Sequence, residues 1–144
     1  MRNQVLSIKQ MQELKELGID TSKARLYLNR NFPNEVYCLH KNDFLKIKEG
    51  KFLFHFSVGD DREEWRCDNL IPTFTLQDIL EILPNFHFIS INYNNYIGYT
   101  MNVCSSNQET FGEIIHTESC MGETNNMLEA AFNMLKWCKQ NNYI

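Results

Sequence analysis

Apolar residues recur at helical spacing in three segments, which cover residues 8–17, 76–83 and 126–139. The first segment follows Ser7, with a glutamine three residues later at the spacing of a capping box, and it ends before Gly18. The second lies between Thr75, a suitable N-cap, and Pro84, which stops a helix. The third follows Asn126, another residue that favours the N-cap position. The sequence therefore predicts three helices.

Shorter runs of apolar and alternating residues predict β-strands. They cover residues 26–28, 36–39, 44–47, 52–57, 65–70, 89–93, 96–103 and 111–116. The turn at residues 48–51 predicts one hairpin. A two-residue turn at Asn94 and Asn95 predicts another, because asparagine tolerates positive φ. The acidic segment 59–64 is interpreted as a turn or an exposed loop.

The order of these elements predicts an α+β fold, in which an antiparallel, meander-like sheet packs against about three helices. The helices near residues 76–83 and 126–139 are expected to cover the sheet. Three alternating rings, Phe52, Phe54 and Phe56, are expected to belong to the core. With 144 residues, of which 43% are apolar and 22% charged, the chain fits a single domain over residues 1–144 that buries its own core.

Charge and cysteine usage limit the classes of partner and the compartment. The net charge of −4 provides no overall positive field for a phosphate backbone, so nucleic-acid binding is not expected. No stretch approaches the roughly 20 apolar residues that span a bilayer, so a membrane partner is not expected either. The five cysteines are odd in number and widely spaced, and no apolar signal core follows Met1. These features predict reduced thiols in a cytoplasmic protein, and they are compatible with a homo-oligomer.

Several segments carry a recognisable pattern, namely residues 72–84 (Pro-Thr-Phe-Thr-Leu-Gln-Asp-Ile-Leu-Glu-Ile-Leu-Pro), 93–99, 134–138 with 142–144, and the Leu-Gly-Ile-Asp segment at 17–20. This pattern resembles a family of small uncharacterised proteins found in gut Bacteroides genomes and their phage-like mobile elements. The resemblance covers the N-terminal helix and roughly the second half of the chain, and it does not extend to residues 24–70. It implies the same fold and an accessory gene of a mobile element as the context, and it supplies no catalytic residues.

Two cysteines and two histidines offer the donor types of a tetrahedral zinc site: Cys38, His40, His116 and Cys120. The chain has no Cys-x-x-Cys pair, however, and nothing in the sequence brings the two halves of this set together. The same residues are interpreted as half-buried sheet positions, so no metal is expected.

Cys120 is the strongest candidate nucleophile, because His116 lies four residues before it and Gly122 two residues after it. The two side chains would face one another only on a helix, whereas Ile114 and Ile115 indicate a strand. A group of carboxylates is interpreted as a solvated turn: Asp60, Asp61, Glu63, Glu64 and Asp68. Nucleotide-binding loops, dinucleotide fingerprints, nucleophile elbows and zinc-protease helix motifs are missing, so no cofactor and no catalytic residue is assigned.

Exposed aromatic rings suggest a different kind of site. Tyr96 lies beside the expected turn, on the polar face, and Trp65 follows the acidic segment, so these two residues are candidate contacts for a protein partner or a small ligand. We therefore interpret the chain as a noncatalytic protein-interaction or small-ligand-binding module, an accessory protein of a mobile element in view of the resemblance. A small Cys/His-dependent enzyme or metal-binding protein is the first alternative, and a nucleic-acid-binding protein is the second.

Overall fold

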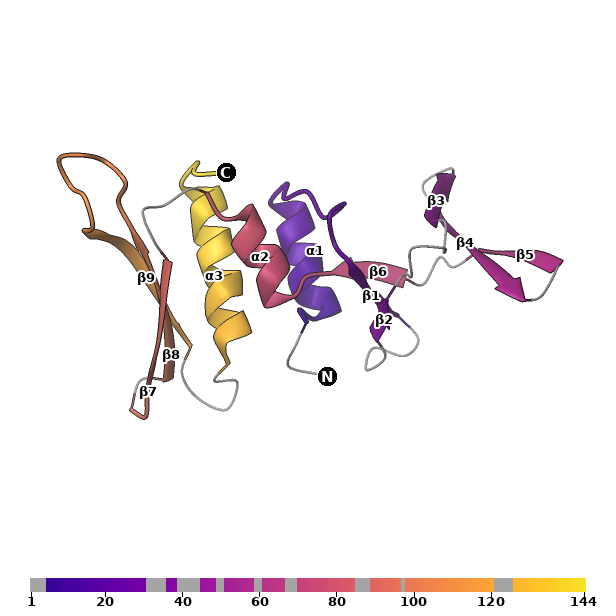
Figure 1. The fold of residues 1–144 in the computed structure, drawn as a ribbon, viewed down its shortest axis with the longest axis horizontal. Helices are drawn as coiled ribbons and strands as arrows, with labels where there is room; N and C mark the ends of the chain where they lie inside the picture. Colours follow the sequence, from indigo (N-terminus) through magenta and orange to yellow (C-terminus); the bar gives the residue numbers. More distant parts are fainter. Residues whose placement is uncertain are drawn as a thin grey trace.

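The computed structural model describes residues 5–30, 36–38, 45–48, 51–58, 61–66, 70–84, 89–96, 98–120 and 126–144. Within these residues it has an α+β fold of three helices and nine strands, and the strands form three antiparallel sheets of three strands each. The helices lie between two of these sheets (Figure 1). The α+β class and the three helices are confirmed, whereas the expected meander accounts for one sheet of the three.

α1 (Ile8–Glu16) begins with the predicted capping box. The Ser7 hydroxyl accepts a hydrogen bond from the Gln10 N–H (3.2 Å), and the Gln10 side-chain oxygen accepts one from the Ser7 N–H (2.9 Å). At the other end Gly18 has a φ of +78°, and the N–H groups of Gly18 and Ile19 donate to carbonyls of the last turn. Both predicted boundary signals of this helix are confirmed.

α2 (Leu76–Ile82) and α3 (Met127–Gln140) also begin where the sequence predicts. The Thr75 hydroxyl accepts from the Asp78 N–H (3.2 Å), while an Asp78 carboxylate oxygen accepts from the Thr75 N–H (2.8 Å). The Asn126 side chain caps α3 in a similar way. None of the described helices has the length and apolar character needed to cross a bilayer.

The first sheet has the strand order β2-β1-β6. β1 (Leu26–Asn29) pairs with β2 (Val36–Cys38) and with β6 (Leu70–Thr73). The strand predicted over residues 65–70 is therefore wrong in its bounds, since Leu70 opens β6, which continues through Pro72. Proline is tolerated at this position because β6 is an edge strand, paired only with β1 among the described strands.

β3 (Leu45–Lys48), β4 (Lys51–Val58) and β5 (Asp61–Arg66) form the second sheet. The predicted hairpin between β3 and β4 is confirmed. The expectation of a turn over the acidic segment is wrong from Asp61 onwards, because the backbone there pairs with β4, and a charged edge strand is physically acceptable. The side chains expected in the core, Phe52, Phe54 and Phe56, lie outside the described part of the structure, as do Asp60 and Asp68.

β7 (Ile89–Asn94), β8 (Gly98–Cys104) and β9 (Ile114–Cys120) form the predicted meander. Asn94 pairs with Gly98, so the turn extends beyond the two asparagines that were expected to form it. Gly98 has a φ of +84°, a conformation that glycine adopts without steric cost, at the point where the chain enters β8.

β9 begins at Ile114, later than the predicted start at Phe111. The loop before it is organised by its own hydrogen bonds, among them one from the Glu113 N–H to the Thr110 carbonyl (3.0 Å). These bonds use backbone groups that a longer strand would need for pairing. A register shift after Val103 marks a β-bulge where β8 and β9 meet this loop.

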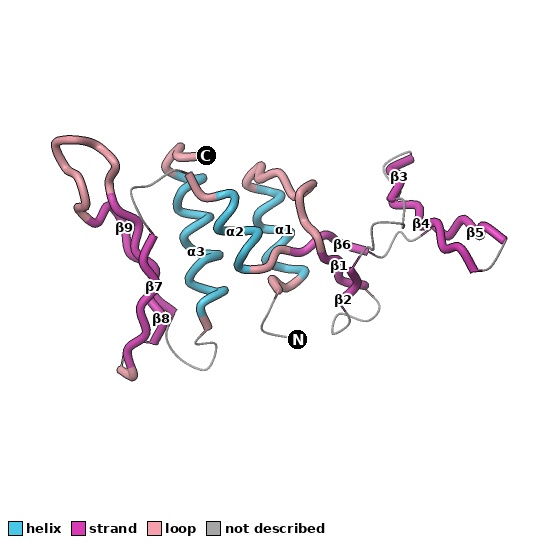
Figure 2. The backbone as a smooth tube through the Cα atoms, in the orientation of Figure 1, coloured by secondary structure: helices cyan, strands magenta, loops and turns pink. Residues whose placement is uncertain are grey.

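α3 lies at the centre of the core. It packs against β8 and β9 on one side and against α2 on the other (Figure 2). Polar contacts tie α1 to it, from Lys136 to Glu13 (Nζ–Oε2 2.9 Å) and from Gln10 to Glu129 (Nε2–Oε2 2.6 Å). The buried residues of these elements form one cluster, which includes Leu14, Phe74, Ile79, Met101, Val103, Met134 and Leu135.

Candidate interaction surface

The β7–β8–β9 sheet has an inner face that α3 covers. Met101 and Val103 of β8 are fully buried in the core cluster. Residues directly opposite one another on neighbouring strands share a face, so Ile91 and His116 also point towards α3. The His116 ring stacks on Trp137 of α3, with ring centroids 4.0 Å apart. Alternate residues of the three strands therefore point away from the helix.

These alternate residues form the outer face, in two cross-strand rows: Asn92, Thr100 and Ser119 in one row, and Ser90, Asn102 and Thr117 in the other. All six side chains end in a hydroxyl or an amide, and none carries a charge. None of the six residues is buried. Figure 1 shows no described helix or strand lying against this face.

Hydrogen bonds hold the second row of the outer face in place. The Thr117 hydroxyl donates to Asn102 Oδ1 (2.6 Å), and Asn102 Nδ2 donates to the Ser90 hydroxyl (3.2 Å). In the first row, the hydroxyls of Thr100 and Ser119 form no side-chain hydrogen bond with another described residue. Because a hydroxyl can both donate and accept, this row can bind a partner group of either kind.

Exposed apolar side chains lie at both ends of the sheet. At the β7–β8 turn, Tyr96 is 96% exposed and Tyr93 is 59% exposed. At the β8–β9 end, Phe111 is 60% exposed and Ile114 is 61% exposed. Every large hydrophobic residue that is exposed in the described part of the chain belongs to this sheet, its loops or the segment after α3. Exposed apolar side chains therefore occur in two separate groups, one at each end of the sheet, and exposed apolar groups mark interaction sites more often than scattered single residues do.

The prediction that Tyr96 is exposed is confirmed. Its backbone N–H donates to the Asn94 side chain (2.8 Å), and this local bond fixes the tip of the turn. Tyr93 packs against Tyr99 with ring centroids 4.8 Å apart, so its ring is also oriented. Trp65, the other predicted contact, lies in β5 of a different sheet, and its side chain is outside the described part of the structure. The two predicted contacts therefore do not share a sheet.

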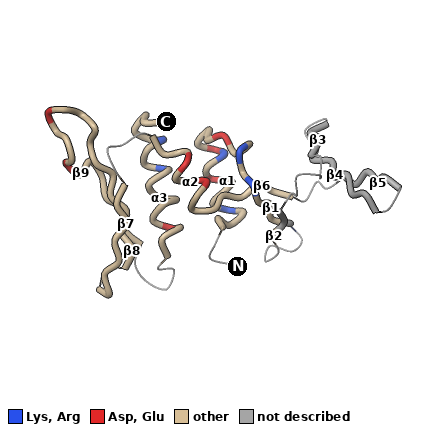
Figure 3. Tube along the Cα trace, in the orientation of Figure 1, with Lys and Arg blue, Asp and Glu red and all other residues tan. Residues whose placement is uncertain are grey.

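The sequence contains a signal for this surface that motif searches miss. Residues 82–108 include no Asp, Glu, Lys or Arg, although 22% of the whole chain is charged. Figure 3 shows the β7–β8 hairpin without charged residues, while charges occur on the helices. Hydroxyl and amide residues have no diagnostic spacing of their own, and only the register of the strands brings them onto one face.

The residues considered for zinc are not brought together. Cys38 lies in β2 and Cys120 and His116 lie in β9, which belong to different sheets, and His40 lies outside the described residues. In the part of the chain that the structure describes, no group of three or more His, Cys, Asp or Glu side chains is placed to hold a metal ion.

His116 and Cys120 do not form a base and a nucleophile. Both lie on the strand β9, where four residues correspond to about 13 Å, so their side chains point the same way but cannot meet. His116 Nε2 instead contacts Glu118 Oε1 at 2.7 Å. The stack of His116 on Trp137 continues to Tyr143, with centroids 5.1 Å apart. This cluster packs the end of α3 against β9.

Cys138 is fully buried on the inward side of α3. Burial raises the pKa of its thiol to about 11, because the thiolate would lose its hydration. The thiol therefore stays protonated at neutral pH and is a poor nucleophile, as expected of a small core residue.

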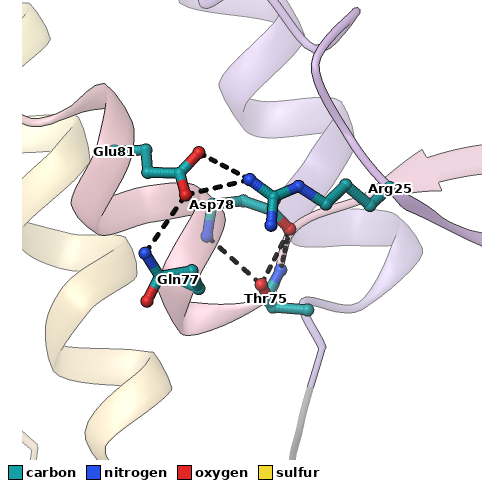
Figure 4. A network of polar contacts seen from close by, with 5 residues as sticks. All are labelled: Arg25, Thr75, Gln77, Asp78 and Glu81. Carbon is teal, nitrogen blue, oxygen red and sulfur yellow. Dashed lines mark hydrogen bonds and ion pairs between the residues drawn. The ribbon is translucent and has the colours of Figure 1, made fainter.

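A polar network joins the residue before β1 to α2 (Figure 4). Arg25 Nη2 donates to both carboxylate oxygens of Glu81 (2.9 and 2.8 Å), and Arg25 Nε lies 3.7 Å from Asp78 Oδ1. Hydrogen bonds from Gln77 and then Arg25 lower the pKa of the Glu81 carboxyl. The Asp78 carboxylate is held by Thr75 as well. Gln77 and Arg25 hold the Glu81 carboxylate in the ionised form, so this side chain is unsuited to acid–base chemistry, and the network clamps two elements together.

Comparison with known proteins finds no significant relative of this chain. No protein-family model matches the chain, and neither the curated proteins nor the solved structures contain a significant match.

Proposed function

We propose that the chain is a noncatalytic protein-interaction module and that the outer face, with the exposed apolar residues at its two ends, is its contact surface. The observation that carries this proposal is a sheet face of six short uncharged side chains, none of them buried, with Tyr96, which is 96% exposed, at the turn between two of its strands. Solvent-facing positions of small domains are usually rich in Lys, Glu, Asp and Arg, so their absence calls for a reason.

Binding to a partner would explain the absence of charged side chains from the outer face. Short side chains such as Thr100 and Ser119 lose little rotamer freedom when a partner fixes them, whereas lysine and glutamate lose much more. Tyrosine adds a large contact area at low entropic cost, and serine and asparagine add adaptable hydrogen bonds. The β7–β8 hairpin combines these residue types with an ordered turn.

The alternative functions have less support. The thiol of Cys120 lies far along a strand from His116, and Cys138 is buried and protonated, so the cysteine-dependent enzyme lacks an assembled site among the described residues. A nucleic-acid interface on the proposed surface would need lysine or arginine, and residues 82–108 contain neither.

Site-specific photo-crosslinking tests the proposal. A photoreactive phenylalanine analogue replaces Tyr96 in the full chain, and the same analogue replaces Lys9, an exposed residue of α1, in a control variant. In extract from cells that make the protein, we expect one discrete adduct from position 96 and none from position 9. The adduct should disappear when Thr100→Lys is added and persist when Gln12→Lys is added on α1. Equal labelling from both positions, or insensitivity to Thr100→Lys, would contradict the proposed surface.

The resemblance to small proteins of Bacteroides mobile elements extends the proposal to a biological context, in which the partner is a factor of the host cell or of a rival element. This extension rests on the resemblance alone. It predicts that genes encoding similar chains lie beside integration or mobilisation genes, and a random distribution of such genes along chromosomes would argue against it.

A further inference from the structure

β7 is an edge strand without the features that normally protect a sheet edge. Among the described strands its only neighbour is β8, so half of its backbone N–H and C=O groups face away from the sheet. Natural edges are protected by charged residues, by proline, by a β-bulge or by very short length. The sequence of β7, Ile-Ser-Ile-Asn-Tyr-Asn, has no charge and no proline, it is six residues long, and its pairing with β8 has no register shift.

The other edges of the described sheets carry such protection. β6 contains Pro72, β3 contains two lysines, and β5 consists largely of charged residues. β2 has only three residues. The opposite edge of the same sheet, β9, has a β-bulge at its start and carries Glu118. β7 is therefore the exception among the described edge strands, and its backbone is suited to pairing with another strand.

We propose that β7 pairs antiparallel with β7 of a second copy of this chain, so that two three-stranded sheets join into one sheet of six strands. A twofold axis perpendicular to the sheet, passing near Ile91, keeps the inner faces of both copies on one side. Tyr93 then lies opposite Ile89 of the partner subunit, an aromatic and β-branched pair that stabilises antiparallel sheets. On the outer face, Ser90 lies opposite Asn92 of the partner subunit, two residues that can share a hydrogen bond.

The sequence of β7 matches itself across the twofold axis, which favours a second copy as the occupant, and its charge does not oppose one. The chain carries a net charge of −4, which opposes self-association in general, but β7 contributes none of it. The residues that flank β7 are uncharged as well, throughout residues 82–108. The two edges therefore meet without repulsion, and both alternating faces match across the axis. The joined sheet also places the two outer faces side by side. The inference does not depend on the proposed function, because it rests on the strand edge and not on the outer face.

Sedimentation equilibrium of the full chain, with native mass spectrometry as a second readout, tests the pairing. We expect a monomer–dimer equilibrium in the wild-type protein. Asn92→Lys places two like charges close to the twofold axis and should raise the dissociation constant about tenfold or more. Thr100→Lys is the matched control, because it adds the same charge to the same face on the central strand β8, and it should leave the dissociation constant unchanged.

A charge-swap experiment gives the decisive outcome. Mixing Asn92→Lys with Asn92→Asp should restore a dimer that contains one chain of each kind, because opposite charges then lie near the axis. A wild-type protein that stays monomeric up to about 100 µM would overturn the inference. A dimer that Asn92→Lys and Thr100→Lys weaken equally, or that neither weakens, would overturn the edge pairing. Loss of the Tyr96 crosslink with an intact dimer would contradict only the proposed function.

Discussion

The two faces of the β7–β8–β9 sheet are formed by the same three strands but have different surroundings. On the inner face Met101 and Val103 are buried under α3, and on the outer face Thr100 and Asn102, their direct neighbours in sequence, remain accessible. Successive residues of a strand point to opposite sides, so a period of two residues separates core from surface. The inner face stabilises the fold, and the side chains of the outer face are not part of the core.

Solubility alone does not explain why the outer face lacks charged residues. An outer face of lysine and glutamate would keep the protein in solution equally well, yet residues 82–108 contain no charge. Fold stability should therefore depend on the inner face and change little when the outer face changes. Substitutions on the two faces test this separation.

The largest effect is expected from Met101→Ala. Met101 is fully buried between β8 and α3, and its truncation leaves a cavity in the core, which should lower the free energy of unfolding by about 2–5 kcal/mol. The matched control is Thr100→Ala on the outer face, which should change it by less than about 0.5 kcal/mol. Urea unfolding at one fixed protein concentration measures both values. Similar losses for the two variants would remove the distinction between the faces.

The second largest effect is a pH dependence of stability, which arises from the buried Cys138 thiol of α3. The pKa of the Cys138 thiol is about 11 in the folded chain, against an ordinary value of 9.0. Below pH 9 the thiol is protonated in both the folded and the unfolded chain, so its ionisation does not change the free energy of unfolding. As pH rises from 9 to 11 only the unfolded chain releases the proton, so the folded state loses up to about 2–3 kcal/mol.

Comparison with Cys138→Ala isolates this effect, because the tyrosines and lysines that titrate in the same range are common to both proteins. The difference in unfolding free energy between the two proteins should shift by up to about 2–3 kcal/mol between pH 8 and pH 11, in favour of the alanine variant. If urea unfolding gives a difference that is constant with pH, the Cys138 thiol is accessible to water and is not buried in the core as the structure shows.

Local signals explain which parts of the fold were predictable. Helix boundaries depend on contacts between residues three or four positions apart, so Ser7, Thr75 and Asn126 identify the starts of all three described helices. β5 was not predictable in the same way. Its acidic residues resemble a turn, and only pairing with β4 in the second sheet makes the segment a strand.

The candidate surface was predictable only in part. Tyr96 could be identified because it adjoins two asparagines that favour a turn. The six hydroxyl and amide residues of the outer face could not be grouped, because their alignment depends on the register between three strands, and on a bulge that shifts β9. The extended backbone of β9 separates His116 from Cys120, which a helix would have brought together.

The inner face changes from buried to exposed towards the β7–β8 turn. The tyrosine pair at that end should therefore make an intermediate contribution to the free energy of unfolding. Tyr93 and Tyr99 lie directly opposite one another with ring centroids 4.8 Å apart. A double-mutant cycle with leucine at each position should give a coupling energy of about 0.5–1.5 kcal/mol. Urea unfolding of the four proteins measures it. Additive effects of the two substitutions would show that the rings do not stabilise one another.

The smallest effect is expected within the outer face itself. Thr117→Val removes the hydroxyl that donates to Asn102 Oδ1 at 2.6 Å and keeps the β-branched shape of the side chain. Because Thr117 is exposed, water can replace the lost hydrogen bond, and the free energy of unfolding should fall by no more than about 0.5 kcal/mol. Val103→Ala, on the inner face of the neighbouring strand, is the comparison and should cost several times more, because Val103 is fully buried. If Thr117→Val proved as costly as Val103→Ala, the hydrogen-bonded row would be a structural element of the sheet, and its uncharged residues would need no partner to explain them.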